Sequence, residues 1–163
     1  MAGMLAMSGA SRSHVLLQQN FAFELHGALR GGNCEVLGSD IRIKVSSRAY
    51  FYADVSVAGG QVADEGDDNL TNPVVIFEVL SPSTERFDRD LKFQRYQSID
   101  SLKDYILVSQ EQVHIEHFTR QADGRWRLRH LWSRDEELKI DSIGVAIPIQ
   151  RIYERVRIGR ATD

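Results

Sequence analysis

The sequence predicts a domain of the α/β (α+β) class, in which helices flank a mixed β-sheet. Three observations support this prediction. An amphipathic helix comes first, apolar segments rich in β-branched residues follow, and a helical segment separates two of these before a final hairpin. A crossover helix combined with a hairpin is typical of a mixed sheet covered by helices.

The first expected helix spans about residues 14–30. Ser11 and Ser13 offer N-caps, and Gly31-Gly32 ends the helix. Apolar residues recur at four-residue spacing and form the side expected to face the core: Leu17, Phe21, Leu25 and Leu29. Polar residues lie partly or wholly outside this stripe: His14, Gln18, Asn20 and Glu24.

Strands are expected next at residues 34–37, 41–45 and 50–57. In the third, alternation with a period of two separates two faces. The more aliphatic face carries Phe51, Ala53, Val55 and Val57, and the other carries Tyr50, Tyr52, Asp54 and Ser56. Asp54 therefore projects away from the aliphatic face.

Residues 59–72 form a turn-rich acidic loop that contains Asp64, Glu65, Asp67 and Asp68. An apolar strand over 74–80 follows, is broken by Ser81-Pro82-Ser83, and leads into a helix over 85–97. Further strands are expected over 104–108, 112–119 and 125–132, with Asp123-Gly124 at the turn between the last two. A short terminal helix is expected over 148–155.

The composition bounds the protein's class. A chain of 163 residues suits one domain with a single core. Its one cysteine, Cys34, cannot form an internal disulfide, and no segment has the pattern of a signal peptide or a membrane span, so we expect a cytoplasmic protein without membrane contact. A net charge of -3 argues against non-specific coating of nucleic acid, so any DNA contact is expected to be local.

Glu78 is the most informative residue, because it interrupts the apolar strand over 74–80. An ionised carboxylate in such a strand costs several kcal/mol unless a cation, a metal or donors compensate it. Asp54 precedes it in a similar strand, and Lys92 follows it. Two carboxylates on neighbouring strands can hold Mg²⁺ or Mn²⁺, with a backbone carbonyl near Val79 and waters completing the shell, and a lysine can assist an attacking water. This order predicts a metal-dependent phosphodiesterase site.

Each residue also has a structural interpretation. Glu78 at a strand end can bond a backbone donor or pair with an arginine, and Asp54 on the polar side of a half-exposed strand is ordinary. Lys92 lies one helical turn after Asp88, which is the favoured order for a solvated intrahelical ion pair. The three residues in the correct order favour the catalytic interpretation over these alternatives.

The same region resembles a bacterial restriction-endonuclease family of the PD-(D/E)XK nuclease superfamily. The most specific part of the match is Phe77-Glu78-Val79-Leu80-Ser81-Pro82-Ser83-Thr84, followed by Asp88-Arg89, Lys92-Phe93 and Tyr96. Ser39-Asp40, Tyr52-Ala53-Asp54-Val55, and His14 with Asn20 fit the same pattern, so the resemblance covers roughly residues 6–153.

The resemblance implies a restriction-endonuclease-like fold, with Asp54 and Glu78 as magnesium ligands and Lys92 as the superfamily lysine moved onto the following helix. The chain departs from the family at three points. Ala53 replaces the usual proline, Leu80 stands where the strict motif has its lysine, and an N-terminal segment of the family is expected to be missing. If that segment supplies a further acidic ligand, Glu24 is a weak replacement for it.

Two further patterns have competing interpretations. Arg125, Arg127 and Arg129 alternate with apolar or aromatic residues and place three guanidinium groups on one strand face. This arginine stripe is either a DNA-facing surface or a solvated strand face. His114 and His117 are three residues apart in a predicted strand, so they point to opposite faces and are expected to be structural or exposed.

The leading hypothesis is a magnesium-dependent (or manganese-dependent) endodeoxyribonuclease that cuts DNA with a metal-activated water. Asp54 and Glu78 would hold the ion, and Lys92 would assist. One alternative is a non-catalytic module that keeps the fold and serves in DNA binding or dimerisation. Another is a hydrolase of small phosphorylated compounds. A homodimer is expected for the nuclease, because cutting both strands of a duplex needs two sites.

Overall fold

The central sheet is organised around two parallel strands, β6 (Pro73–Leu80) and β7 (Asp104–Ser109). The computed structural model describes residues 10–60 and 68–159. The six strands lie in the order β1-β4-β6-β7-β8-β9, and the pairs other than β6–β7 are antiparallel. The outer strands are β1 (Glu35–Leu37), β4 (Val55–Ala58), β8 (Ile115–Arg120) and β9 (Trp126–Leu131). The expected mixed sheet is confirmed.

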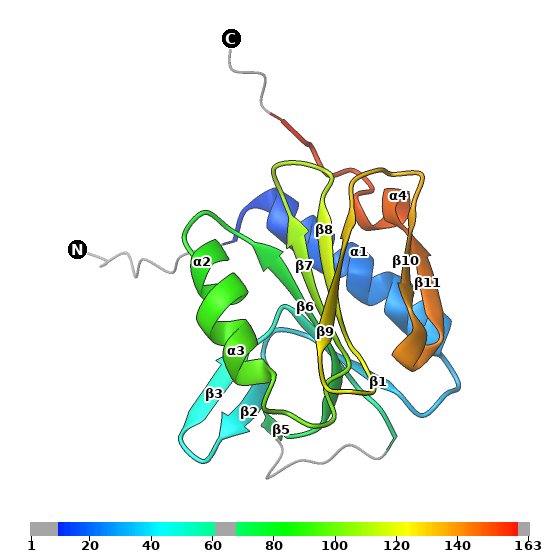
Figure 1. The fold of residues 1–163 in the computed structure, drawn as a ribbon. Coiled ribbons are helices and arrows are strands. Elements are labelled where there is room, and N and C mark those ends of the chain that lie inside the picture. The colour runs from blue at the N-terminus through cyan, green and yellow to red at the C-terminus, as the bar shows by residue number, and fades with distance from the viewer. Residues whose placement is uncertain (1–9, 61–67, 160–163) are drawn as a thin grey trace, which may run out of the picture.

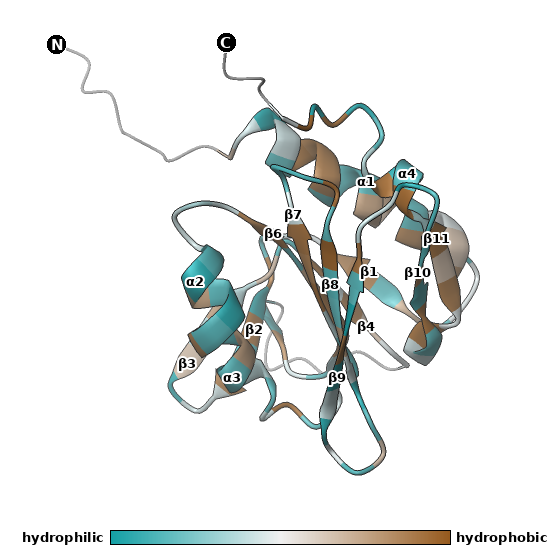
Figure 2. Cartoon of the chain, turned by 45° about the horizontal axis from the view of Figure 1, so that its top comes forward, coloured by the Kyte–Doolittle hydropathy of each residue, from teal (hydrophilic) through white to brown (hydrophobic). Residues whose placement is uncertain are grey.

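Strand β6 divides the core into two layers. Its odd-numbered residues Val75, Phe77 and Val79 belong to one buried cluster, whereas Ile76 and Leu80 belong to the other. Successive side chains of a strand point to opposite faces, so Glu78 shares the face of Ile76 and Leu80. Figure 2 shows β6 and β7 as mostly hydrophobic strands in the middle of the molecule.

One face of the sheet is covered by helix α1 (Arg12–Leu29), helix α4 (Ile149–Ile152) and the hairpin of β10 (Glu137–Ile140) and β11 (Val145–Pro148) (Figure 1). Ser11 caps α1 by accepting a hydrogen bond from His14 N at 3.1 Å. The predicted stripe is buried at Leu17, Phe21 and Leu25, and the Phe21 ring stacks on Phe77 with 3.7 Å between centroids.

The other face is covered by one helical run, made of α2 (Glu85–Phe87), η1 (Asp88–Lys92) and α3 (Phe93–Tyr96). Its middle part, η1, is a π-helix, a rare conformation that is found often at functional sites. A small sheet of order β3-β2-β5 lies on the same side of the molecule (Figure 1) and consists of β3 (Ala49–Tyr52), β2 (Arg42–Ser46) and β5 (Asn69–Leu70).

The structure corrects several predicted elements. The single strand expected over 50–57 is wrong, because the chain breaks at Ala53-Asp54 and its halves join different sheets as β3 and β4. The β10–β11 hairpin, with helix η2 (Asp141–Ile143) between its strands, was not predicted, nor was β5. The terminal helix expected over 148–155 is shorter in the structure, where it consists of α4. Of the acidic loop, Asp64, Glu65 and Asp67 lie outside the described residues, whereas Asp68 pairs with Arg42 at 3.2 Å.

Within residues 10–60 and 68–159, no helix is long and apolar enough to cross a membrane.

Candidate active site

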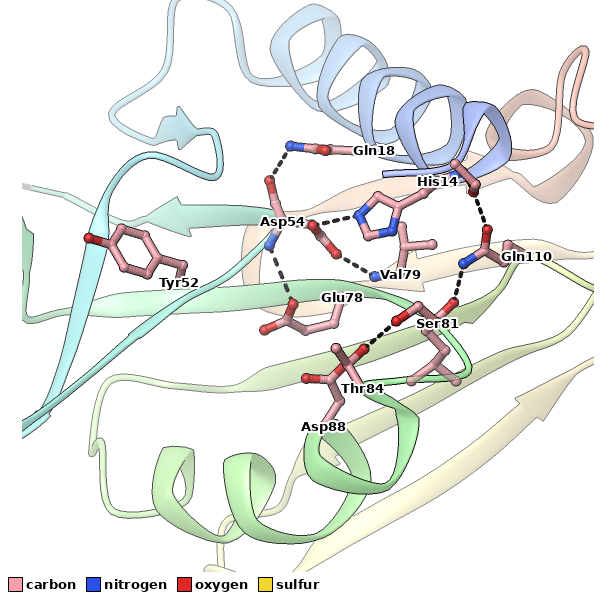
Figure 3. A network of polar contacts seen from close by, with 12 residues as sticks. His14, Gln18, Tyr52, Asp54, Glu78, Val79, Ser81, Thr84, Asp88 and Gln110 are labelled. Atoms are coloured by element: carbon pink, nitrogen blue, oxygen red, sulfur yellow. Dashed lines mark hydrogen bonds and ion pairs between the residues drawn. The ribbon is translucent and has the colours of Figure 1, made fainter. Parts of the chain in front are cut away.

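Asp54 occupies the break between β3 and β4, which frees its side chain from the alternation of either strand. Its Oδ1 atom lies 2.8 Å from Nε2 of His14, and its Oδ2 atom accepts a hydrogen bond from Val79 N at 2.7 Å. Gln18 donates to the Asp54 carbonyl at 2.9 Å. Figure 3 shows these groups converging from α1, from the break and from β6. The carboxylate is therefore fixed beside the end of β6.

Glu78 lies beside Asp54 on the face of β6 that the helical run covers. Asp54 N approaches its Oε2 atom at 3.4 Å, and the residue is only 3 % exposed. Burial raises the pKa of Glu78 to about 8, the carboxylates of Asp54 and Asp88 add to this effect, and Lys92 opposes it. Because the charge of Glu78 is costly in this place, a cation there is strongly favoured.

Lys92 reaches this pair of carboxylates from η1. Its Nζ atom lies 2.5 Å from Oε1 of Glu78 and 3.5 Å from Oδ1 of Asp88, and it donates to the Tyr52 carbonyl at 2.7 Å. Burial lowers the pKa of Lys92, but the nearby carboxylates outweigh this effect and raise it. The intrahelical pair with Asp88 exists, but it is buried rather than solvated.

The residues fit a hard divalent cation. Asp54 and Glu78 offer carboxylate oxygens of the kind that Mg²⁺ and Mn²⁺ prefer. The backbone carbonyl of Val79, predicted as a further ligand, belongs to a residue that contacts Asp54 through its N–H. Oε1 of Glu78 is a buried oxygen whose neighbour is the Lys92 ammonium at 2.5 Å. An ion held by both carboxylates would add further positive charge beside this buried oxygen.

The structure does not bring the other predicted residues to this site. The cross-strand pairs His117–Arg129 and Thr119–Arg127 place the arginine stripe on the sheet face opposite to Glu78. Glu24 pairs with Arg151 at 3.3 Å instead of approaching Asp54. His114 and His117 point to opposite faces, as predicted. His117 is buried and contacts Asp104 Oδ1 at 2.6 Å.

Two features that adjoin the site had no role in the sequence-based hypothesis. His14 and Gln18 contact Asp54. In the sequence, they could have been noticed as two polar residues that lie one helical turn apart, outside the apolar stripe of α1. The second feature is a cavity of about 450 Å³ near the start of α1, which we call the arginine pocket; its lining includes Arg12, Arg155 and Arg157. Gln110 also lines it and donates to the Leu80 carbonyl at 2.7 Å, which connects the pocket to the end of β6.

A solved structure has the same fold as this chain. The crystal structure of "a putative nuclease belonging to DUF820" from Anabaena variabilis ATCC 29413 superposes with a TM-score of 0.74, and the match covers 91% of this chain and 84% of that chain at 11% sequence identity. The two proteins thus share one fold, a mixed sheet flanked by helices.

Sequence comparison then identifies the family. Residues 3–150 match the model of the Uma2 family, described as "Putative restriction endonuclease", and the chain belongs to this family. Two similar proteins come from Synechocystis sp. (strain ATCC 27184 / PCC 6803 / Kazusa). "Uncharacterized protein slr1290" is 35% identical over 91% of this chain and 78% of its own length, and "Uncharacterized protein sll1609" is 32% identical over 83% and 78%.

Proposed function

We propose that this protein is a magnesium-dependent endodeoxyribonuclease that hydrolyses phosphodiester bonds in DNA. The observation that carries the proposal is the meeting of two carboxylates and one lysine at the break before β4 and the end of β6, with Lys92 Nζ at 2.5 Å from Glu78. Membership of the Uma2 family supports a nuclease, and the buried position of Glu78 supports a cation. Mn²⁺ suits the same oxygen ligands.

Each residue has a distinct role in this proposal. Asp54 and Glu78 hold the ion, which when bound supplies an activated water and charge stabilisation at the phosphoryl oxygens. His14 and the Val79 N–H fix the direction of the Asp54 carboxylate. Lys92 is held by Glu78, Asp88 and the Tyr52 carbonyl, from where its ammonium can steady the developing negative charge or orient the attacking water.

The arginine pocket is the surface best placed to receive the DNA backbone. No ion pair links Arg12, Arg155 or Arg157 to another described residue. Guanidinium groups bind phosphate oxygens in a fork geometry, and the pocket also lies beside the N-terminal end of the long helix α1. Phosphates held there would align the strand with the Asp54 carboxylate that His14 contacts.

The decisive experiment is a calorimetric Mn²⁺ titration of the parent protein, Asp54→Asn and Glu78→Gln, followed by a supercoiled-plasmid nicking assay in Mg²⁺. One site in the parent that disappears in both variants, together with nicking by the parent and none by Glu78→Gln, is the expected result. Glu35→Gln, which changes an exposed carboxylate on β1, is the matched control. Mn²⁺ binding that survives both site variants would refute the assignment.

One observation favours a second function, a non-catalytic DNA-binding module. The carboxylates of Asp54 and Glu78 are already contacted by protein donors, namely His14, Lys92 and backbone N–H groups, so the site is partly neutralised by the protein itself. Fluorescence anisotropy separates the two functions. DNA binding that ignores divalent ions and persists in Glu78→Gln, with no nicking by the parent, would establish the module.

The nuclease proposal includes a homodimer in the cytoplasm, where its DNA substrate is. Cleavage of both strands of a duplex needs two sites, and a two-fold dimer is the simplest way to present them. Sedimentation velocity at several protein concentrations tests this point. A monomer at all concentrations that linearises plasmid only through sequential nicks would contradict the dimer and leave the site assignment unaffected.

A further inference from the structure

A second cluster of ligating side chains lies on the same sheet face as Glu78. His114, Glu116 and His130 offer ligand atoms that all lie within 4.8 Å of one another. Glu116 and His130 face each other across the β8–β9 pair, and His114 lies two residues before Glu116 and so shares its face. The three residues therefore come from one end of one strand pair.

The cluster is separate from the candidate active site. Cross-strand partners form a single row of Glu78, Leu107, Glu116 and His130. Since neighbouring strands lie about 4.8 Å apart, Glu116 is about 10 Å from Glu78. The two groups also differ in chemistry, because one contains carboxylates and a lysine, whereas the other contains two imidazoles and one carboxylate.

The imidazoles are held in a geometry that suits a metal. His114 Nε2 and His130 Nδ1 lie 3.0 Å apart and share a hydrogen bond, whose proton a bound ion would displace. With metal–nitrogen bonds of about 2.0–2.1 Å, this separation corresponds to an angle of about 91–97° at the ion. Such an angle is that of neighbouring ligands in tetragonal or octahedral coordination, as Ni²⁺ and Cu²⁺ prefer.

The surroundings fix the ligands before any ion arrives. The His114 ring stacks on Trp132 with 3.6 Å between centroids and 3° between planes, and Tyr153 OH bonds to both His114 N and His114 O. Arg89 forms an ion pair with Oε2 of Glu116, so the carboxylate has its other oxygen, Oε1, to offer.

We propose that His114, Glu116 and His130 form a second metal site, which binds a late first-row divalent ion such as Ni²⁺, Cu²⁺ or Zn²⁺ and does not bind Mg²⁺. Two imidazoles and one carboxylate leave positions open for water, and imidazole suits these ions far better than it suits Mg²⁺. His130 is exposed on the edge strand, which gives the ion a route of entry.

The stacking of Trp132 on His114 provides a direct readout. The chain has two tryptophans, and the other, Trp126, lies at the far end of β9. Tag-free protein is titrated with Ni²⁺ while tryptophan emission and heat are recorded. We expect one site that quenches emission, weakened by about 100-fold or more in His130→Ala and in Glu116→Gln. Trp132→Phe should lose most of the quenching yet keep the heat of binding.

Two controls distinguish binding at this site from metal binding elsewhere on the protein. His26→Ala removes an exposed histidine of α1 and should bind Ni²⁺ as the parent does. Glu78→Gln should also bind normally, so failure of the proposed nuclease centre and failure of this site are distinguishable. The inference is overturned if the folded parent binds neither Ni²⁺ nor Zn²⁺, or if binding persists in His130→Ala.

Discussion

Glu78 shows what burial does to one residue. Its side chain has a β-strand on each side and a helix above it, so the energy of its charge depends on Lys92 and on any cation that joins it. The sequence predicted this residue because a carboxylate stood out in an apolar strand. It could not predict the contacts that Asp54 N and Lys92 make with Glu78, since these depend on how the break at Asp54 and the π-helix place distant groups.

The raised pKa of Glu78 predicts a pH-dependent stability. The folded-state pKa is about 8 and the reference value is 4.5, so between these values the folded state holds more protons. The contribution of Glu78 to stability is then full below about pH 4.5 and falls as the pH rises towards 8, by about 1.4 kcal/mol per unit. Urea unfolding in chelator should show this decline in the parent between pH 5.5 and 7.5, and a much smaller one in Glu78→Gln. Parallel curves for the two proteins would contradict it.

His14 is a positioning residue in the proposed site, and its removal should weaken metal binding without unfolding the protein. His14→Ala takes away the group at 2.8 Å from Asp54 Oδ1, and we expect about tenfold weaker Mn²⁺ binding by calorimetry. His14→Gln can still donate and should recover part of the loss. His26→Ala on the same helix is the control, and equal affinities for His14→Ala and the parent would exclude the role.

At the scale of elements, the long regular segments could be predicted and the irregular ones could not. Helix α1 has apolar residues at four-residue spacing, and strands β6 and β7 are short apolar runs that contain β-branched residues, so each pattern favours the element that forms. The alternation over 50–57 continued smoothly across Ala53-Asp54, so the pattern contained no sign of the break. The short strands β10 and β11 also alternate, but each has only four residues, and their turn depends on Gly144 at φ 65°.

A buried polar group joins several elements and predicts a large loss of stability. Asp104 at the start of β7 contacts His117 of β8 at 2.6 Å and accepts a hydrogen bond from Ser142 of η2. His117→Ala would leave a buried carboxylate without its imidazole partner, at a cost of about 3 kcal/mol. Urea unfolding measures the loss, and adding Asp104→Asn should restore part of it. A change below about 1 kcal/mol would show that Ser142 and Thr119 suffice.

At the scale of the whole molecule, charge is distributed by face. The net charge is -3, yet two basic surfaces stand out, the arginine pocket near the start of α1 and the arginine stripe along β9. The pocket connects through Gln110 to the end of β6, whereas the stripe lies on the face opposite to Glu78. The sequence could identify the stripe because its three arginines are close together in the sequence. The pocket combines residues from both ends of the chain and needs the fold.

This difference predicts which surface binds DNA. Replacing Arg12 and Arg155 with alanine should weaken duplex binding. It should also make the binding constant less dependent on salt: the slope of log K against the logarithm of the salt concentration should become shallower by about 0.9 for each phosphate that the protein no longer neutralises. Replacing Arg125 and Arg127 with alanine removes the same charge from the opposite face and should change neither quantity much. Anisotropy titrations at several salt concentrations provide the measurement. A larger effect from the stripe would assign DNA to the other face.

The position of Lys92 has a consequence for the time course of the reaction. Its ammonium stands 2.5 Å from Oε1 of Glu78, so on the proposed function this contact must lengthen as the ion enters, while Asp88 and the Tyr52 carbonyl keep Lys92 at the site. Binding of the ion is then limited by a first-order rearrangement of the protein. Product should appear after a lag when Mg²⁺ is added last, and without a lag when protein and Mg²⁺ are incubated before the DNA.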